Sequence, residues 1–123
     1  MRTIKFRAWD KERKEMYYSD FRVDFNGRIF WWKSEEGYED WRHDDTVELM
    51  QYTGLEDKNG KEIYEGDIVK DEIRRWEVCW EQARGQFMRK ALKAKVPLSE
   101  RQIKMYKVKV IGNVYENPEL LNT

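Results

Sequence analysis

The chain has 123 residues, with 24 basic and 24 acidic side chains, a formal net charge of zero, and 15% aromatic residues. The length favours one domain over residues 1–123, and the aromatic content argues against a disordered chain. Cys79 is the single cysteine, which excludes an intramolecular disulfide and argues against a cysteine-based zinc site.

The amino-terminal part is expected to form short strands. Residues 3–9 alternate apolar and charged side chains with the period of two that is typical of a strand, and residues 15–18 are expected to return as a second strand. Residues 21–25 alternate again and lead into Asn26-Gly27. This pair favours a two-residue hairpin turn, with residues 28–33 as the returning strand.

Four further strands are expected, separated by Gly- and Asn-rich turns. They are 47–52, 68–73, 76–81 and 106–110. Asp67 stands just before one of them, and its side chain is expected to accept bonds from local backbone amides and so lock the turn.

Three helical segments are expected. In residues 86–96, apolar side chains recur at three-to-four spacing with Lys and Arg between them, which predicts an amphipathic helix stopped by Pro97. A second turn of helix is expected at 99–104. Asn117 is a good N-cap before Pro118, so residues 118–121 are expected to form a helical turn that buries Leu120 and Leu121. The predicted fold is mainly β, an antiparallel pseudobarrel of short strands with these helical additions.

Charge is unevenly spread along the chain. Residues 34–67 carry twelve acids and three bases, a net of −9, whereas residues 84–109 carry nine bases and one acid, a net of +8. This asymmetry leaves three interpretations open: pairing within one fold, head-to-tail self-association, or a basic face for an anionic partner.

Four stretches together resemble the YopX family. They are Ile4-Lys5-Phe6-Arg7-Ala8-Trp9-Asp10, residues 49–55, Gly66-Asp67-Ile68-Val69, and Ile111-Gly112-Asn113-Val114-Tyr115-Glu116-Asn117-Pro118-Glu119-Leu120-Leu121. The resemblance implies a β-rich pseudobarrel with short helices and an origin in phages or prophages of Gram-positive bacteria. It implies no established activity and supplies no catalytic residues.

Two groups of side chains are candidate binding surfaces. Basic residues with rings among them are candidate nucleic-acid contacts, because they can neutralise phosphates. These are Arg84, Arg89, Lys90, Lys93, Lys95, Arg101 and Lys104. Exposed aromatic patches often mark protein interfaces, so a second group forms a candidate interface for a protein partner or for self-association. This group is Trp31, Trp32, Tyr38 and Trp41.

Candidates for chemistry are sparse. His43 is the only histidine, and it lies in the acidic run 35–45, where oxygen ligands alone could hold magnesium or calcium without any EF-hand spacing. Cys79 lies mid-strand, where a cysteine is usually an inert filler. No catalytic, cofactor-binding or metal residue is therefore assigned.

The sequence favours a non-catalytic phage or prophage accessory protein that acts by protein binding or self-association. The first alternative is a nucleic-acid-binding module that uses residues 84–109, and the second is a metal-dependent enzyme that uses the acidic loop 35–45. No run of about 20 apolar residues suits a membrane span, and no signal-peptide h-region is found. We therefore expect no membrane partner and a location in the cytoplasm of the bacterial host.

Overall fold

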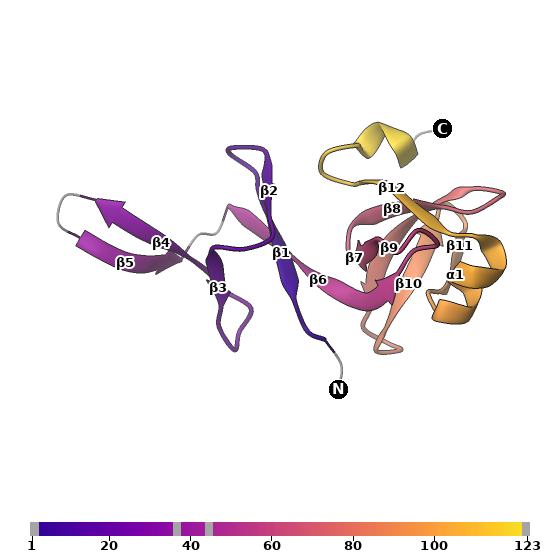
Figure 1. Cartoon of the computed structure of the whole chain (residues 1–123), viewed down its shortest axis with the longest axis horizontal. Coiled ribbons are helices and arrows are strands. Elements are labelled where there is room, and N and C mark those ends of the chain that lie inside the picture. The colour runs from indigo at the N-terminus through magenta and orange to yellow at the C-terminus, as the bar shows by residue number, and fades with distance from the viewer. Residues whose placement is uncertain (1–2, 36–37, 44–45, 122–123) are drawn as a thin grey trace. The chain divides into compact units, whose positions relative to one another are not determined.

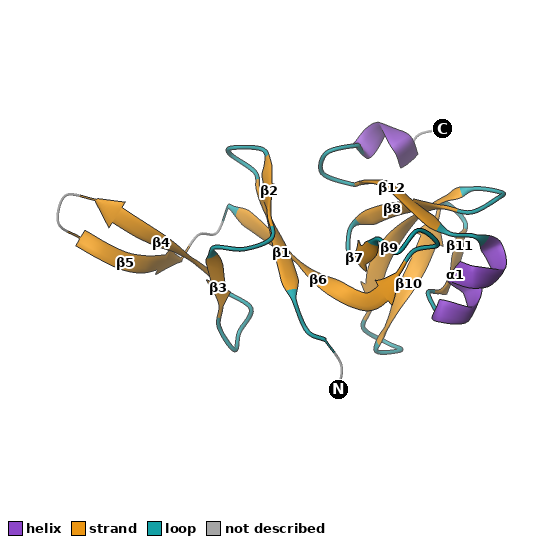
Figure 2. Ribbon diagram, viewed as in Figure 1, coloured by secondary structure: helices purple, strands orange, loops and turns teal. Residues whose placement is uncertain are grey.

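The computed structural model describes residues 3–35, 38–43 and 46–121, and it describes side chains outside residues 31–45. Within these residues the protein is mainly β, with one α-helix and one 3-10 helix (Figure 2), which confirms the predicted fold class. No helix among them is long and apolar enough to cross a bilayer.

The chain divides into two compact units, which are described separately. The smaller unit comprises Phe6–Met50, and the larger comprises Met1–Lys5 with Gln51–Thr123. Strand β6 (Val47–Glu56) begins in the first and ends in the second. The expectation of a single domain stays a prediction.

The smaller unit is built from hairpins (Figure 1). Its strands are β1 (Phe6–Asp10), β2 (Glu15–Tyr17), β3 (Phe21–Val23), β4 (Ile29–Glu35) and β5 (Tyr38–His43). Strands β1 and β2 pair antiparallel, and β3, β4 and β5 form an antiparallel sheet in that order. A small core unites Ala8, Ile29 and Val47. The expected strands near the amino terminus are confirmed, whereas β5 was not predicted.

The β3–β4 hairpin has a longer loop than predicted. Val23 pairs with Ile29, and the amide of Asp24 donates to the carbonyl of Arg28 at 3.0 Å, so three residues form the loop. Gly27 takes the left-handed conformation at φ 79°, as three-residue hairpin loops require at one position. The carboxylate of Asp24 accepts bonds from the amides of Asn26 and Arg28 at 2.9 Å each, which favours this loop over the expected two-residue turn.

The larger unit contains a five-stranded antiparallel sheet that curls into a half-barrel (Figure 1). The sheet order is β11-β10-β9-β8-β12. Its strands are β8 (Asp67–Lys70), β9 (Arg75–Glu81), β10 (Gln86–Ala91), β11 (Ala94–Pro97) and β12 (Lys109–Asn113). The short β7 (Glu62–Tyr64) pairs with β6, and the amide of Tyr52 in β6 donates to the carbonyl of Lys5 at 2.8 Å.

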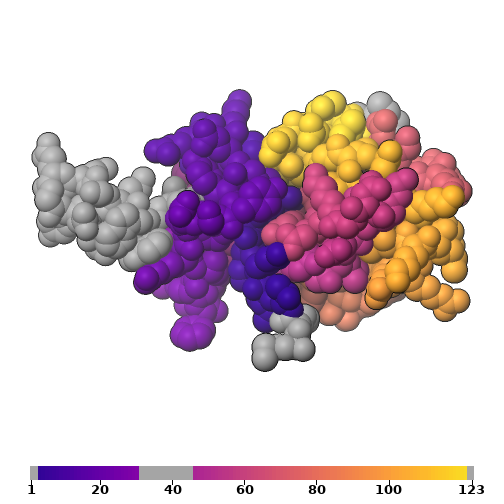
Figure 3. Space-filling view, in the orientation of Figure 1, coloured from indigo at the N-terminus to yellow at the C-terminus, as the bar shows by residue number. Residues whose placement is uncertain are grey.

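One face of this sheet is the core. Successive side chains of a strand point to opposite faces, and the alternate residues Trp76 and Val78 of β9 point to the covered one. The buried core residues of the unit are Ile63, Val69, Trp76, Val78, Leu98, Ile103 and Val108. In the space-filling view, the magenta, orange and yellow residues of this unit pack closely together (Figure 3). Each large aliphatic side chain buried here contributes about 1.5–3 kcal/mol.

The amphipathic helix expected at 86–96 is wrong, because this segment is the β10–β11 hairpin. Met88 and Arg89 are adjacent and both are buried, so the two faces of β10 are both covered. Leu92, which the helical pattern placed on the apolar side, is 97% exposed in the turn. The three-to-four spacing of apolar residues therefore does not mark one face of a helix. It combines apolar residues from both strand faces with those of the turn.

The other two helical predictions hold. Helix α1 (Glu100–Tyr106) begins at Ser99, whose Oγ accepts from the amide of Gln102 at 3.3 Å, and it ends at Lys107 in the left-handed conformation. The 3-10 helix η1 (Pro118–Leu121) follows Asn117, as expected. Leu120 is half-buried and Leu121 is exposed, so the expected burial of both is wrong.

Candidate functional site: a basic groove on the larger unit

A groove of about 950 Å³ lies on the five-stranded sheet of the larger unit. Its lining comes from β8, β9, β10, two turns and η1. The lining residues are Lys70, Ile73, Arg74, Arg75, Glu77, Lys90, Ala91, Leu92, Lys93 and Leu121.

Strand register gathers the charged floor of the groove. Lys70 pairs with Arg75 across β8 and β9, and Glu77 pairs with Lys90 across β9 and β10. Side chains at paired positions share a face, and residues two apart on a strand also share one. These four side chains therefore lie on the face opposite the core residues Val69, Trp76 and Val78.

Exposed aliphatic side chains form the rim. Ile73 in the β8–β9 turn is 80% exposed, Leu92 in the β10–β11 turn is 97% exposed, and Leu121 in η1 is 37% exposed. Arg75 Nη1 donates to the carbonyl of Leu120 at 3.2 Å, which fastens η1 to the sheet beside the groove. The site thus combines a charged floor with an apolar border.

The groove is strongly cationic. Five lining side chains are basic and only Glu77 is acidic, a formal net charge of four positive. Glu77 is already partnered, since its Oε2 lies 3.8 Å from Lys90 Nζ. Lys70 and Lys93 are exposed, and no ion pair to either is found within the described part of the chain. A concave surface of one sign concentrates oppositely charged groups.

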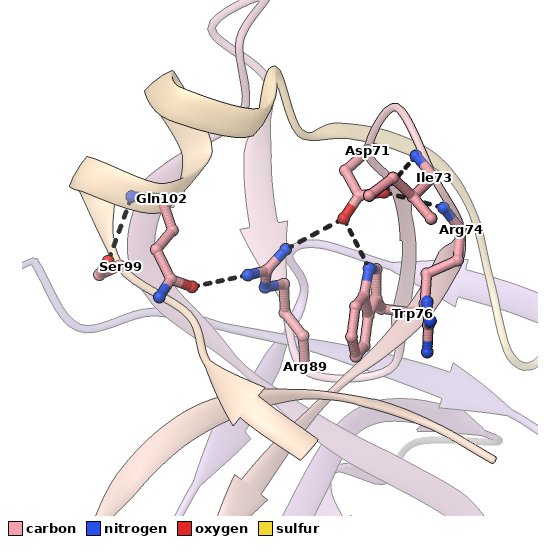
Figure 4. A network of polar contacts seen from close by, with 7 residues as sticks. All are labelled: Asp71, Ile73, Arg74, Trp76, Arg89, Ser99 and Gln102. Carbon is pink, nitrogen blue, oxygen red and sulfur yellow. Dashed lines mark hydrogen bonds and ion pairs between the residues drawn. The ribbon is translucent and has the colours of Figure 1, made fainter. Parts of the chain in front are cut away.

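A buried polar network supports the rim (Figure 4). Arg89, 3% exposed, lies between Asp71 of the β8–β9 turn and Gln102 of α1. Its Nη2 donates to Gln102 Oε1 at 2.6 Å, and its Nη1 lies 3.6 Å from Asp71 Oδ2. Its guanidinium carbon lies 5.1 Å from the centre of the Trp76 ring. Burial lowers the pKa of Arg89, and the charge of Asp71 opposes that change.

Asp71 ties this network to the rim. Its Oδ1 accepts from the amides of Ile73 and Arg74 at 2.8 Å each, and its Oδ2 accepts from Trp76 Nε1 at 2.9 Å. Burial raises the pKa of Asp71, but the bonds from Arg74, Ile73 and Trp76 and the charge of Arg89 outweigh it, so the pKa lies below its ordinary value. The turn that presents Ile73 to the groove is therefore held by a buried carboxylate.

The predicted nucleic-acid contacts are dispersed by the fold. Lys90 and Lys93 line the groove, and Arg89 is buried beneath it. Three others pair with nearby glutamates: Arg84 and Lys95 with Glu81, at 3.2 Å each, and Lys104 with Glu100 at 3.1 Å. Arg101 is exposed on α1. The seven residues thus form no single surface, and nucleic-acid contact stays a prediction.

The other predicted sites are less informative. Register aligns Trp31 with Arg42 and Trp32 with Trp41 across β4 and β5, but the side chains of Trp31, Trp32, Tyr38 and Trp41 lie outside the described residues. The same holds for His43 and the acidic run 35–45. Among described residues, no group of three or more His, Cys, Asp or Glu could hold a metal ion.

Cys79 lies mid-strand in β9 and is half-buried. Burial raises the pKa of its thiol, which agrees with an inert filler.

Sequence reasoning missed much of the groove, above all Lys70, Ile73, Arg74 and Arg75. Strand alternation could have placed Lys70 and Arg75 opposite the apolar Val69 and Trp76. Nothing local in the sequence indicates that η1 meets them.

The YopX protein family model matches residues 5–122. The chain belongs to the YopX family. Among solved structures, protein EF1440 from Enterococcus faecalis is similar, with 31% identity and a TM-score of 0.67 over 98% of this chain and 99% of that one. Protein yopX from Bacillus subtilis is also similar, with 25% identity and a TM-score of 0.64 over the same shares. No curated protein matches the chain.

The residues that carry the YopX likeness build turns. Asp67 Oδ2 accepts from the amide of Tyr64 at 2.8 Å, which confirms the predicted locking role. Asn113 Oδ1 accepts from the amides of Tyr115 and Glu116 at 3.0 and 2.8 Å, and so shapes the turn before η1. Asp67 and Asn113 thus support the scaffold, and of the YopX-like stretches only the last contributes to the groove lining, through Leu121.

Proposed function

We propose that this protein is a non-catalytic phage or prophage accessory protein that binds a protein partner through the basic groove, in the cytoplasm of the bacterial host. The ligand is an acidic polypeptide segment with apolar side chains. One observation supports this most: a groove whose lining carries four net positive charges is bordered by exposed Ile73, Leu92 and Leu121. The YopX assignment supports the phage or prophage setting through the family resemblance.

The composition of the groove favours a polypeptide over a nucleic acid. Single-stranded nucleic acids are typically held by basic side chains together with aromatic rings that stack on bases. Apart from Glu77, the residues lining this groove are basic or aliphatic, and none of them is aromatic. Aliphatic rims suit the apolar side chains of a peptide, while Lys70 and Lys93 suit its carboxylates.

The groove is also suited to binding rather than to acid–base chemistry. General acid–base catalysis uses a positioned group whose proton is exchanged near neutral pH. The single carboxylate in the lining, Glu77, is paired with Lys90, and the remaining ionisable groups are lysines and arginines.

The alternative of nucleic-acid binding rests on a different surface. Helix α1 and its end expose Arg101, Lys104 and Lys107 together with Tyr106. A basic helix with an exposed ring can contact phosphates and a base. This surface lies outside the groove lining, so the two proposals can be tested by separate variants.

Fluorescence anisotropy with labelled ligands tests the proposal. A peptide of alternating Glu and Leu is the probe, a Lys–Leu peptide is its control, and a single-stranded and a double-stranded oligonucleotide are the competitors. We expect the Glu–Leu peptide to bind, and the double variant K70E/K93E to weaken binding by about tenfold or more, an effect of roughly 1.4 kcal/mol. Added salt should weaken binding as well.

The matched control is K58E/K61E, which makes the same charge change on an exposed turn of the same unit. It should bind like the wild type. Equal loss in both double variants would mean that only net charge matters, and the groove proposal would fail. Tighter binding of an oligonucleotide, abolished by R101E/K104E, would favour α1 and nucleic acid instead.

A further inference from the structure

One segment of this chain has the negative charge expected of a ligand for the groove. Residues 34–45 hold six acids and one Arg, a formal net of five negative with His43 neutral. The groove has four net positive charges. The two charges are opposite and similar in size, so the segment and the groove are electrostatically complementary.

The described residues of this acidic segment lie in β4 and β5. Register pairs Lys33 with Asp40, Ser34 with Glu39, and Glu35 with Tyr38, so three of the acids fall within successive pairs of β4 and β5. The same two strands contain Trp31, Trp32 and Trp41. A hairpin that carries both acids and large apolar rings matches a groove that has both a basic floor and an aliphatic rim.

We propose that the β4–β5 hairpin of one copy docks into the basic groove of a second copy. This inference rests on the proposed function and names the partner for that site. The two surfaces differ, and each copy has both, so the contact is heterologous. Successive copies therefore add head to tail, which produces a ring where the rotation closes and an open chain where it does not.

Sedimentation velocity over a wide range of protein and salt concentrations tests the inference. The wild type should increase in average mass with concentration and dissociate as salt screens the charges. The groove variant K70E/K93E and the hairpin variant E35K/E39K should each remain monomeric where the wild type associates. The control K58E/K61E should associate like the wild type, and circular dichroism should show that all variants are folded.

Mixing the two monomeric variants gives the decisive result. The groove variant keeps an acidic hairpin and the hairpin variant keeps a basic groove, so an equimolar mixture should form one-to-one complexes. A mixture that stays monomeric would overturn the inference. So would a wild type that is monomeric throughout, as expected if the groove is filled within one copy, or an oligomer that neither variant affects.

The proposed function can survive this failure. A monomeric wild type that still binds the Glu–Leu peptide through Lys70 and Lys93 would retain the groove as a site for another protein. A wild type that neither self-associates nor binds the peptide would remove both proposals.

Discussion

The buried pair of Asp71 and Arg89 leads to a quantitative prediction: Asp71→Asn should destabilise the larger unit more than Arg89→Met. In Asp71→Asn, an amide oxygen can still accept from the backbone of the turn. The amide nitrogen then faces two donors, the indole of Trp76 and the guanidinium of Arg89. The nearly fully buried cation loses its carboxylate, and Arg89 Nε and Nη1 have no hydrogen-bond partner among the described residues to compensate. Removing one partner of a buried pair costs about 3–5 kcal/mol.

Arg89→Met has a smaller expected cost because it removes the buried charge itself. Met is apolar and unbranched, so it can fill much of the same space, and Asp71 keeps its three N–H donors. The loss of the bond to Gln102 should then cost about 1–2 kcal/mol. The double variant contains no unpaired charge, so its cost should fall below the sum of the single costs by about 2 kcal/mol or more.

Urea unfolding at pH 7, followed by both tryptophan fluorescence and circular dichroism, measures these differences. Coincidence of the two signals is the requirement for quoting a single free energy of unfolding. Asp24→Asn is the matched control, because Asp24 caps a similar turn but its pair with Arg28 is exposed, so its effect should be small. Additive losses in the free energy of unfolding, or a larger loss for Arg89→Met, would refute the idea that the carboxylate of Asp71 stabilises the buried charge of Arg89.

Three further effects are expected. Since the pKa of Asp71 lies below its ordinary value of 3.8, the contribution of this carboxylate to stability is present above about pH 4. This contribution should be lost as the pH falls through the folded-state pKa. Urea midpoints measured at successively lower pH should therefore fall less steeply in Asp71→Asn than in the wild type. In Gly112→Ala the new Cβ would lie 2.6 Å from Asn117 Oδ1, and the resulting displacement should cost about 1–3 kcal/mol in thermal or urea unfolding. Asp57→Ala removes the acceptor for the amide of Val110 at 2.9 Å and two bonds within its own turn, and should cost about 3 kcal/mol in the same assay.

Local signals in the sequence predicted the parts of the fold that depend on neighbouring residues. Asn26-Gly27 marked the β3–β4 hairpin, because Gly27 supplies the positive φ that the loop needs. Asp67 was recognised as a turn lock, and Asn117-Pro118 as the start of η1. In each case the cause is a local backbone conformation or a hydrogen bond to a group only a few residues away, so short sequence windows contain it.

Features that depend on contacts between distant segments could not be predicted from short sequence windows. Strand β10 is covered on both faces, with Met88 and Arg89 both buried, so its pattern lacks the period of two and was mistaken for a helix. The groove is assembled by strand register and by η1, which adds Leu121 to the lining that Lys70 also forms. Only two of its residues, Lys90 and Lys93, were predicted as binding residues, because the sequence signal was their charge and not their position.

The late position of β12 in the chain has a consequence for synthesis on the ribosome. This strand pairs with β8, and the amide of Val110 bonds to Asp57, 53 residues earlier. At translation rates of about 5–20 residues per second, the nascent chain waits roughly 3–10 s between these two residues. During that interval β8 lacks its neighbouring edge strand, and its unpaired edge is open to chaperones or to other nascent chains. Nonsense mutations before Lys109 should therefore produce aggregates rather than a shortened folded unit.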